Sequence, residues 1–216
     1  MFTQIERCGI VPVIKIKDAA KAAPLALALK NGGVGVVEIT FRTAAAPDAI
    51  AAIAKEVPDM LVGAGTVLTQ EQLKDAKDAG ARFIVSPGLD AGIVRQAQAY
   101  RLPVIPGVVT PSEICAALNL GLTAVKFFPA ANYGGAATVK ALAAPFGGVR
   151  FVPTGGIDAR NAEEYWKIPQ VLAVGGSWMA PESLIDAGDF AAIERLAAEA
   201  AALRARVTHR NFNPTC

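Results

Sequence analysis

Two ionisable residues stand within runs of apolar residues, where a charge is costly to bury. The first is Lys126, in the segment AVKFFP that begins at residue 124. An ammonium group among apolar side chains is disfavoured unless it is paired or loses its proton, and a neutral amine can attack a ketone. The resulting imine can accept the electrons of a breaking carbon–carbon bond. Lys126 is therefore a candidate Schiff-base nucleophile. The alternative is a structural lysine that reaches outward or pairs with a carboxylate.

The second such residue is Glu38, in the segment VVEIT at residues 36–40. Successive residues of a strand point to opposite faces, so Val36, Glu38 and Thr40 share one face. If that face lines the interior of the fold, Glu38 can meet Lys126 and act as the acid/base that moves protons for it. The alternative is a buried ion pair that serves only structure.

Lys15 is a competing lysine, in the segment VIKI at residues 13–16. Its strand is not followed by a glycine-rich turn of the kind that shapes a binding site. We therefore expect a structural or outward-facing role for Lys15.

Two glycine-rich segments near the end of the chain are typical of phosphate binding. They are PTGGID at residues 153–158 and VGGSW at residues 174–178. Glycine lets the backbone approach an anion closely, while exposed N–H groups and hydroxyls donate to its oxygens. The predicted phosphate-binding residues are Thr154, Gly155, Gly156 and Ser177. Either segment alone could be an ordinary tight turn.

Arg42 and Thr66 follow two other apolar runs and could hold a carboxylate. The guanidinium of Arg42 can grip a carboxylate through two parallel hydrogen bonds, and the hydroxyl of Thr66 can donate a third. A 2-keto acid would fit such a pair. A solvated surface arginine is the alternative for Arg42.

The elements that must position these residues repeat eight times along the chain. Each repeat has a short apolar run, a turn rich in Gly, Pro, Thr or Ser, and an Ala- and Leu-rich segment with helical spacing, which predicts parallel strands joined by helices. The expected strands are residues 11–16, 36–40, 61–66, 83–86, 104–108, 124–128, 151–154 and 171–174. Eight units without a longer linker predict a single α/β domain that spans residues 1–216. They favour a (β/α)₈ TIM barrel with a parallel eight-stranded core and argue against a doubly wound open sheet.

Three segments outside the eight repeats complete this expectation. Residues Phe2–Cys8 should form a short helix that covers the bottom of the barrel. Residues 190–207 should form a final helix on its outside, and residues 208–216 should form a frayed tail, to which no role is assigned.

Composition narrows the class of protein further. The 216 residues are 53% hydrophobic and 19% charged, with a formal net charge of +2 and no cluster of Lys and Arg interleaved with aromatics. Neither nucleic acid nor a membrane is an expected partner, and a cytoplasmic location is expected. Three widely separated cysteines and a single histidine, His209, argue against a metal site and against a Ser/His/Asp triad.

Six ordered segments together resemble the bacterial 2-keto-3-deoxy-6-phosphogluconate (KDPG) aldolases, a family that also acts on 4-hydroxy-2-oxoglutarate. The segments are VEITFRT (37–43), VGAGTV (62–67), FIVSPG (83–88), VKFFP (125–129), PTGGI (153–157) and GGSW (175–178). They span nearly the whole chain. The resemblance implies a lyase of the Entner–Doudoroff pathway of carbohydrate metabolism, a class I aldolase that needs no metal or other cofactor and assembles as a homotrimer.

The same resemblance assigns a role to each matching residue. Lys126 would form the Schiff base with pyruvate and Glu38 would be the general acid/base. The remaining assignments are the carboxylate-binding Arg42 and Thr66, the pocket residues Pro87 and Phe128, and the phosphate-binding Thr154, Gly155, Gly156 and Ser177. The substrate would be a phosphorylated keto acid, cleaved to pyruvate and glyceraldehyde 3-phosphate.

Three alternatives share parts of this interpretation. A 2-dehydro-3-deoxy-6-phosphogalactonate aldolase would keep the lysine and the glutamate, and the segment Arg42-Thr43 favours the gluconate type. A phosphosugar isomerase or epimerase on the same barrel would keep the phosphate site without an imine. A non-catalytic phosphosugar-binding protein would keep Lys126 and Glu38 only as an ion pair.

Overall fold

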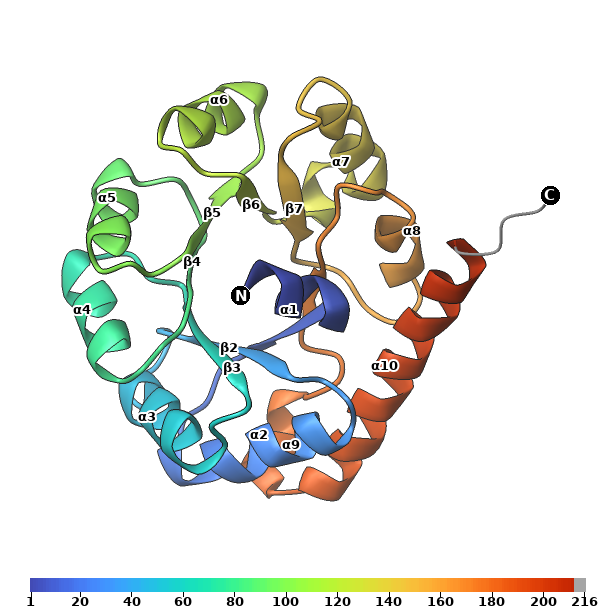
Figure 1. Ribbon diagram of the computed structural model, residues 1–216. Coiled ribbons are helices and arrows are strands. Elements are labelled where there is room, and N and C mark those ends of the chain that lie inside the picture. The colour runs from blue at the N-terminus through green and yellow to red at the C-terminus, as the bar shows by residue number, and fades with distance from the viewer. Residues whose placement is uncertain (212–216) are drawn as a thin grey trace.

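The computed structural model describes the backbone of residues 1–211 and the side chains of residues 1–207. Within this part of the chain, eight parallel strands alternate with helices around a barrel (Figure 1). The strands are β1 (Ile10–Ile14), β2 (Val36–Thr40), β3 (Leu61–Gly65), β4 (Ile84–Ser86), β5 (Val104–Val108), β6 (Ala124–Phe127), β7 (Arg150–Pro153) and β8 (Val174–Gly176). The predicted (β/α)₈ barrel is confirmed.

Hydrogen bonds close the strands into a ring. Each strand from β1 to β6 pairs with the next in the sequence, and β8 returns to pair with β1. Two isolated parallel bridges, Phe151 with Val171 and Thr154 with Gly175, join β7 to the segment that contains β8. The carboxyl ends of all eight strands therefore meet at one end of the barrel, where barrels of this type build their active sites.

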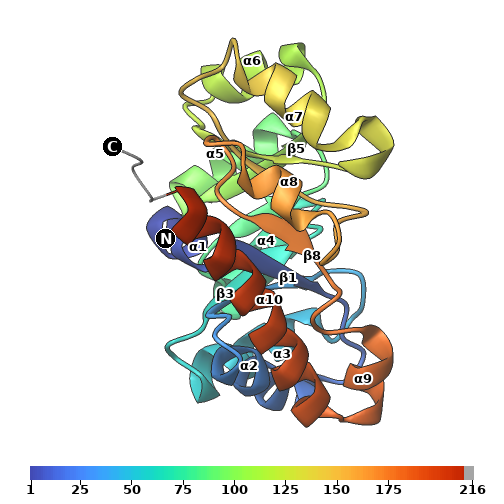
Figure 2. The same ribbon diagram turned by 90° about the vertical axis from the view of Figure 1, so that its right-hand side faces the viewer.

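Helices surround the ring and close its other end. They are α1 (Phe2–Cys8), α2 (Ala22–Asn31), α3 (Ala46–Glu56), α4 (Gln70–Asp78), α5 (Ala91–Ala99), α6 (Pro111–Asn119), α7 (Gly135–Ala143), α8 (Ala162–Trp166), α9 (Glu182–Ala187) and α10 (Phe190–Asn211), with short 3₁₀ turns at Ala19–Lys21 and Ala131–Tyr133. Helix α1 lies across the amino-terminal end of the barrel, as predicted, and α9 lies at the opposite end (Figures 1 and 2).

Strand alternation separates two apolar layers. In β1, Ile14 packs in the layer between strands and helices, while Val11 packs inside the barrel. The inner layer also contains Ile5 of α1, which is fully buried and plugs the lower end. The inner apolar layer therefore forms an apolar floor, and a side chain that points inward nearer the carboxyl ends of the strands lies above it.

The eighth strand differs from the prediction of residues 171–174. Hydrogen bonding places β8 at Val174–Gly176, where Val174 pairs with Ile10 and Gly176 with Pro12. The apolar run before it does not alternate regularly, since the consecutive residues Leu172 and Ala173 both pack inside the barrel. The glycine-rich segment that was expected to be a turn after the strand therefore supplies the strand itself.

The chain end also differs in part. Helix α10 continues to Asn211, so the prediction of a frayed tail is wrong for residues 208–211. The remainder of that predicted tail, residues 212–216, lies outside the described residues.

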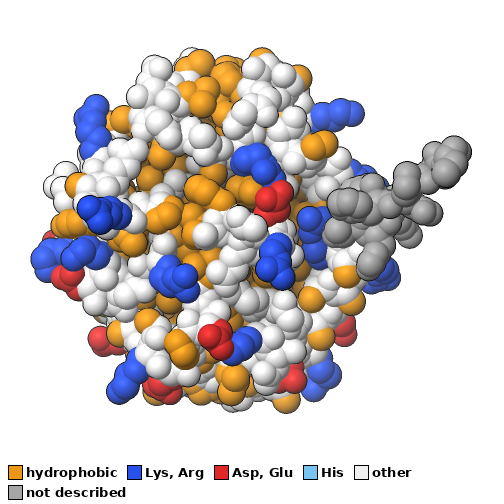
Figure 3. Space-filling view, in the orientation of Figure 1, with side chains coloured by type: hydrophobic (Ala, Val, Ile, Leu, Met, Phe, Trp, Pro, Cys, Tyr) orange, Lys and Arg blue, Asp and Glu red, His pale blue; other side chains and the backbone are white. Residues whose placement is uncertain are grey.

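The described part of the chain has no apolar spanning helix, and the charges on the face closed by α1 are mixed. Among the helices that the structure describes, none is long and apolar enough to cross a bilayer. On the face closed by α1, Lys and Arg side chains are scattered among acidic, apolar and neutral groups (Figure 3).

A capping box fixes the start of α6, just beyond β5. The Thr110 hydroxyl accepts a hydrogen bond from the Glu113 N–H, and the Glu113 carboxylate accepts from the N–H groups of Thr110 and Val109. Burial tends to raise the pKa of Glu113, but the Val109 N–H and the Thr110 hydroxyl and N–H outweigh it and hold that pKa below its usual range.

We predict that Thr110→Ala lowers the free energy of unfolding by about 1 kcal/mol, measured by urea denaturation, because the cap loses its acceptor. Ser112→Ala, at the exposed second position of the same helix, is the control and should change it by less than about 0.5 kcal/mol. Since the folded pKa of Glu113 is depressed, its contribution is present above the unfolded pKa and is lost as the pH falls through the folded one. Equal stability of the two variants would contradict the capping account.

Candidate active site

A lysine and a glutamate meet inside the barrel. Strand β6 carries Lys126 and strand β2 carries Glu38, and the Lys126 Nζ lies 3.5 Å from the Glu38 Oε1. Both residues are almost fully buried, with exposed fractions of 5% for Lys126 and 2% for Glu38. The predicted meeting of the two residues in the lumen is therefore present. A pair at this distance can pass a proton directly or through one water.

The neighbouring strands hold this pair in place. Glu38 is in register with Val13 of β1 and Gly63 of β3, while Lys126 is in register with Gly107 of β5. A methyl group at Gly65, at the end of β3, would overlap the Glu38 carboxylate. Glycine at this position thus gives the carboxylate the space it occupies.

An aromatic ring lies beside the lysine. The Lys126 Nζ is 5.0 Å from the centre of the Phe128 ring, within the range of a cation–π contact. Phe128 also lines the cavity described next, so it borders both the amine and the space that a substrate would enter.

A cavity of about 270 Å³ opens at the carboxyl ends of the strands. Six of the residues predicted from the sequence line it: Arg42, Phe128, Thr154, Gly155, Gly156 and Ser177. Gly155 and Gly156 both take positive φ values, 100° and 72°, which side chains other than glycine rarely adopt. The cavity is therefore walled on one side by backbone and hydroxyl groups suited to an anion.

The ion pair lies at the deep end of this cavity, where Val13, in register with Glu38, is part of the wall. Lys126 is in register with Val152, and Thr154, just beyond the end of β7, is in the cavity wall. A molecule that reaches from the cavity to Lys126 would place one end at the amine and the other near the glycine-rich wall.

Two predicted residues lie elsewhere. The cavity wall, as formed by residues 1–207, does not include Thr66 or Pro87. Thr66 follows β3 with a positive φ of 55°, and Pro87 lines a separate hollow beside Leu68 and Asp90. The structure thus brings Arg42 to the cavity without its predicted partner Thr66.

The sequence reasoning missed two charged residues of the cavity wall, Lys15 and Glu182. Their side chains form an ion pair of 3.1 Å. Of the two roles expected for Lys15, the outward-facing one is wrong, because Ile14 and Ile16 occupy the outer layer and Lys15 must point to the other face. That alternation was a usable signal. The ion pair with Glu182 is compatible with the other expected role, a structural one. Glu182 lies in α9, and no motif marks it.

Fold and site together define a class: a (β/α)₈ enzyme with a buried lysine–carboxylate pair at the base of a cavity with a glycine-rich wall. Comparison with known proteins gives the family. Residues 2–196 match the KDPG and KHG aldolase family. The chain belongs to this family and is a lyase of the aldolase type.

Individual relatives of the chain bear the names of the same family. The chain is 49% identical to the 2-dehydro-3-deoxy-phosphogluconate aldolase of Treponema pallidum, over 91% of this chain and 93% of the relative. It is 48% identical to the KHG/KDPG aldolase of Escherichia coli K12, over 88% and 90%. Among solved structures, the KDPG aldolase of Legionella pneumophila with pyruvate captured as a covalent carbinolamine intermediate is 42% identical with a TM-score of 0.88, over 92% of this chain and 96% of that one.

We predict that Gly65→Ala lowers kcat for aldol cleavage by about 100-fold, because the added methyl group displaces the Glu38 carboxylate from Lys126. Pyruvate release coupled to lactate dehydrogenase measures it. Gly148→Ala is the control, since a methyl group at this exposed position meets no other atom within 4 Å and should leave kcat unchanged. A Gly65→Ala variant with the parental kcat would show that the position of Glu38 is unimportant.

Proposed function

We propose that the protein is a class I aldolase that cleaves 2-dehydro-3-deoxy-6-phosphogluconate into pyruvate and glyceraldehyde 3-phosphate through an imine on Lys126. The single observation that carries this proposal is the buried Lys126–Glu38 pair at the base of a cavity with a glycine-rich wall. A buried amine next to one carboxylate has a partner that can take its proton and return it.

The proposed reaction has three stages: imine formation, carbon–carbon bond cleavage and release of pyruvate. The Lys126 amine adds to the C2 ketone, and loss of water, with one proton supplied by the Glu38 carboxyl, gives a protonated imine. The C3–C4 bond then breaks, its electrons move into the iminium, and the C4 hydroxyl proton passes to a base, which leaves glyceraldehyde 3-phosphate and an enamine. Protonation of the enamine at C3 and hydrolysis release pyruvate and free Lys126.

Glu38 is the proposed general acid/base of these steps. Its carboxylate lies at hydrogen-bonding distance from the amine, 3.5 Å, and has an apolar floor beneath it. Water can carry the proton between Glu38 and the more distant substrate atoms. Positioned groups of this kind contribute about 100-fold to 10,000-fold to the rate.

The remaining site residues have proposed binding roles. Arg42, at the cavity wall, would hold the substrate carboxylate, and Thr66 would have to reach it from just outside that wall. The phosphate would lie against Thr154, Gly155, Gly156 and Ser177. Phe128 would pack beside the imine, and Pro87 would shape the pocket from its adjoining hollow.

Named relatives support the substrate and the chemistry. One is the KDPG aldolase with pyruvate captured as a carbinolamine. Another is the KDPG aldolase of Zymomonas mobilis with 3-phosphoglycerate, which is 44% identical with a TM-score of 0.87, over 94% of this chain and 95% of that one. By this likeness we propose a place in the Entner–Doudoroff pathway and additional activity on 4-hydroxy-2-oxoglutarate, the second activity named for the E. coli relative.

Two further properties are proposed from the family resemblance. The chain would act as one domain, free in the cytoplasm, and would assemble as a homotrimer. Light scattering on the purified protein tests the trimer, because the mass of one chain is 22.3 kDa.

Substrate choice is tested with the two epimers. The gluconate assignment predicts a higher kcat/KM for 2-dehydro-3-deoxy-6-phosphogluconate than for its galactonate epimer, measured by pyruvate release. A preference for the galactonate epimer would replace this substrate while keeping the lysine chemistry.

We predict that Lys126→Met abolishes pyruvate release, because the methionine side chain has no amine to form the imine. Lys55→Met, on the exposed side of α3, should retain the parental kcat and serves as the matched control. Removing one partner also leaves the Glu38 carboxylate buried and unpaired, which costs about 3–5 kcal/mol of stability, so circular dichroism must confirm that the variant is folded. Substantial cleavage by a folded Lys126→Met protein would exclude the proposed mechanism and favour an isomerase-like site.

A further inference from the structure

The wall of the cavity carries a lysine that the proposed mechanism does not use. Lys15 lies just beyond the end of β1, and β1 pairs with β8, whose end supplies Gly176 and Ser177 to the same wall. Val13 is in register with Glu38, so Lys15, two residues further along, lies one layer nearer the mouth. Its height in the barrel therefore matches that of the glycine-rich wall and not that of the ion pair.

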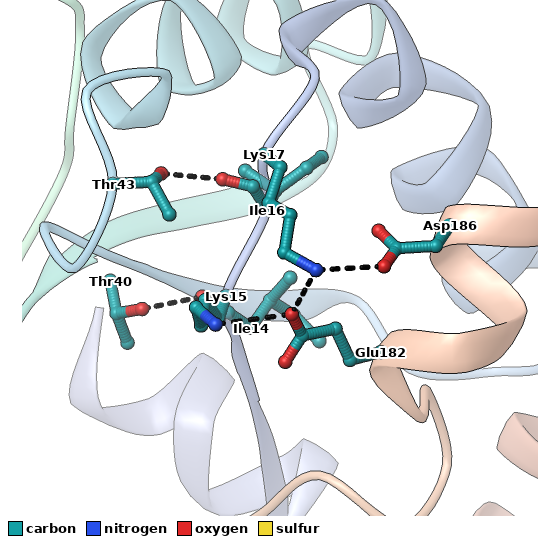
Figure 4. Close-up of polar contacts among 8 residues, drawn as sticks. All are labelled: Ile14, Lys15, Ile16, Lys17, Thr40, Thr43, Glu182 and Asp186. Carbon is teal, nitrogen blue, oxygen red and sulfur yellow. Dashed lines mark hydrogen bonds and ion pairs between the residues drawn. The ribbon is translucent and has the colours of Figure 1, made fainter.

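Hydrogen bonds on both sides fix the backbone at Lys15. The Thr40 hydroxyl donates to the Ile14 carbonyl, and the Thr43 hydroxyl donates to the Ile16 carbonyl (Figure 4). Both isoleucines are 1% exposed in the outer layer. The Lys15 side chain is thereby directed into the mouth, where it remains 33% exposed.

The Lys15 ammonium has a carboxylate partner that does not depend on it. The Glu182 Oε1 accepts from Lys15 at 3.1 Å and lies 2.6 Å from the Lys17 Nζ, which also contacts Asp186 at 2.9 Å (Figure 4). Lys17 is not part of the cavity wall. If Lys15 turned away, Glu182 would still be neutralised by Lys17.

Glu182 itself requires this neutralisation. The ammonium groups of Lys17 and Lys15 hold the pKa of the Glu182 carboxyl below its usual range, so it is charged at neutral pH. A carboxylate in the same wall as the glycine-rich segments would repel a bound phosphate unless a cation lay between them. Lys15 is paired with Glu182 and lines the same cavity as the glycine-rich segments.

We propose that Lys15 is a specificity-determining residue that contacts the terminal phosphate of the substrate, exchanging its hydrogen bond to Glu182 for one to a phosphate oxygen. The other proposed donors to this phosphate, Thr154, Gly155, Gly156 and Ser177, are all neutral. Lys15 adds the positive charge that distinguishes a phosphate from an uncharged hydroxyl. Half-exposed ion pairs are weak, so the exchange of partners costs little. This inference rests on the proposed function.

The test compares two substrates and two matched lysines. KM and kcat for pyruvate release are measured with 2-dehydro-3-deoxy-6-phosphogluconate and with the same sugar acid lacking the phosphate, for the parent, Lys15→Met and Lys17→Met. Lys15→Met should raise KM for the phosphorylated substrate by about tenfold or more and leave both constants for the unphosphorylated one within about twofold. Lys17→Met should change neither KM nor kcat by more than about threefold with either substrate.

A direct probe and a conservative variant distinguish the loss of the Lys15 charge from a structural effect of the substitution. Inorganic phosphate, as a competitive inhibitor, should have an inhibition constant raised in parallel by Lys15→Met, and Lys15→Arg should restore both values. If Lys15→Met does not fold, Lys15→Gln carries the same test.

The proposal is overturned if Lys15→Met affects the two substrates equally, or affects the phosphorylated one no more than Lys17→Met does. Failure of the proposed function gives a different result, because the parent protein would then release pyruvate from neither substrate.

Discussion

The cost of burying a charge inside an apolar barrel is the constraint on which the rest of this structure depends. Lys126 and Glu38 are both more than nine-tenths buried, and neither could remain charged there alone. Each charge needs the other as a partner. The strands that carry them, β6 and β2, must therefore hold the two side chains at the same height inside the barrel. Closing the ring through β1 and β8 achieves this, and the glycine at the end of β3 leaves the volume that the carboxylate fills.

The barrel arranges its side chains in layers along one axis. Helix α1 and the inner apolar residues close the barrel from below, the ion pair lies above them, and the glycine-rich wall with Lys15 and Arg42 forms the mouth. An extended keto acid phosphate has its ketone and its phosphate several bonds apart. The layers can therefore receive the two ends of one molecule at once, with the reactive carbon at the amine. In the proposed reaction, binding energy from the phosphate end would orient the carbon–carbon bond that breaks.

Much of this arrangement could be predicted from the sequence because strand alternation and buried charge are local signals. Glu38 and Lys126 stand out as ionisable residues in apolar runs, and the eight repeats indicate the barrel. The position of β8 was less accessible, because the consecutive residues Leu172 and Ala173 both face inward and mimic a strand. The role of Lys15 was missed although the same alternation that placed Glu38 inside also places Lys15 inside. Glu182 could not be found at all, since its place in the wall depends on how α9 packs over the mouth, 167 residues after Lys15.

The central claim is that Lys126 is the amine that binds the keto acid covalently. Incubation with pyruvate and sodium borohydride, followed by intact mass measurement and peptide mapping, tests it most directly. We predict one added reduced pyruvate per chain, located on the peptide that contains Lys126. A folded protein without an adduct, or with the adduct on the peptide of another lysine such as Lys15, would contradict the account.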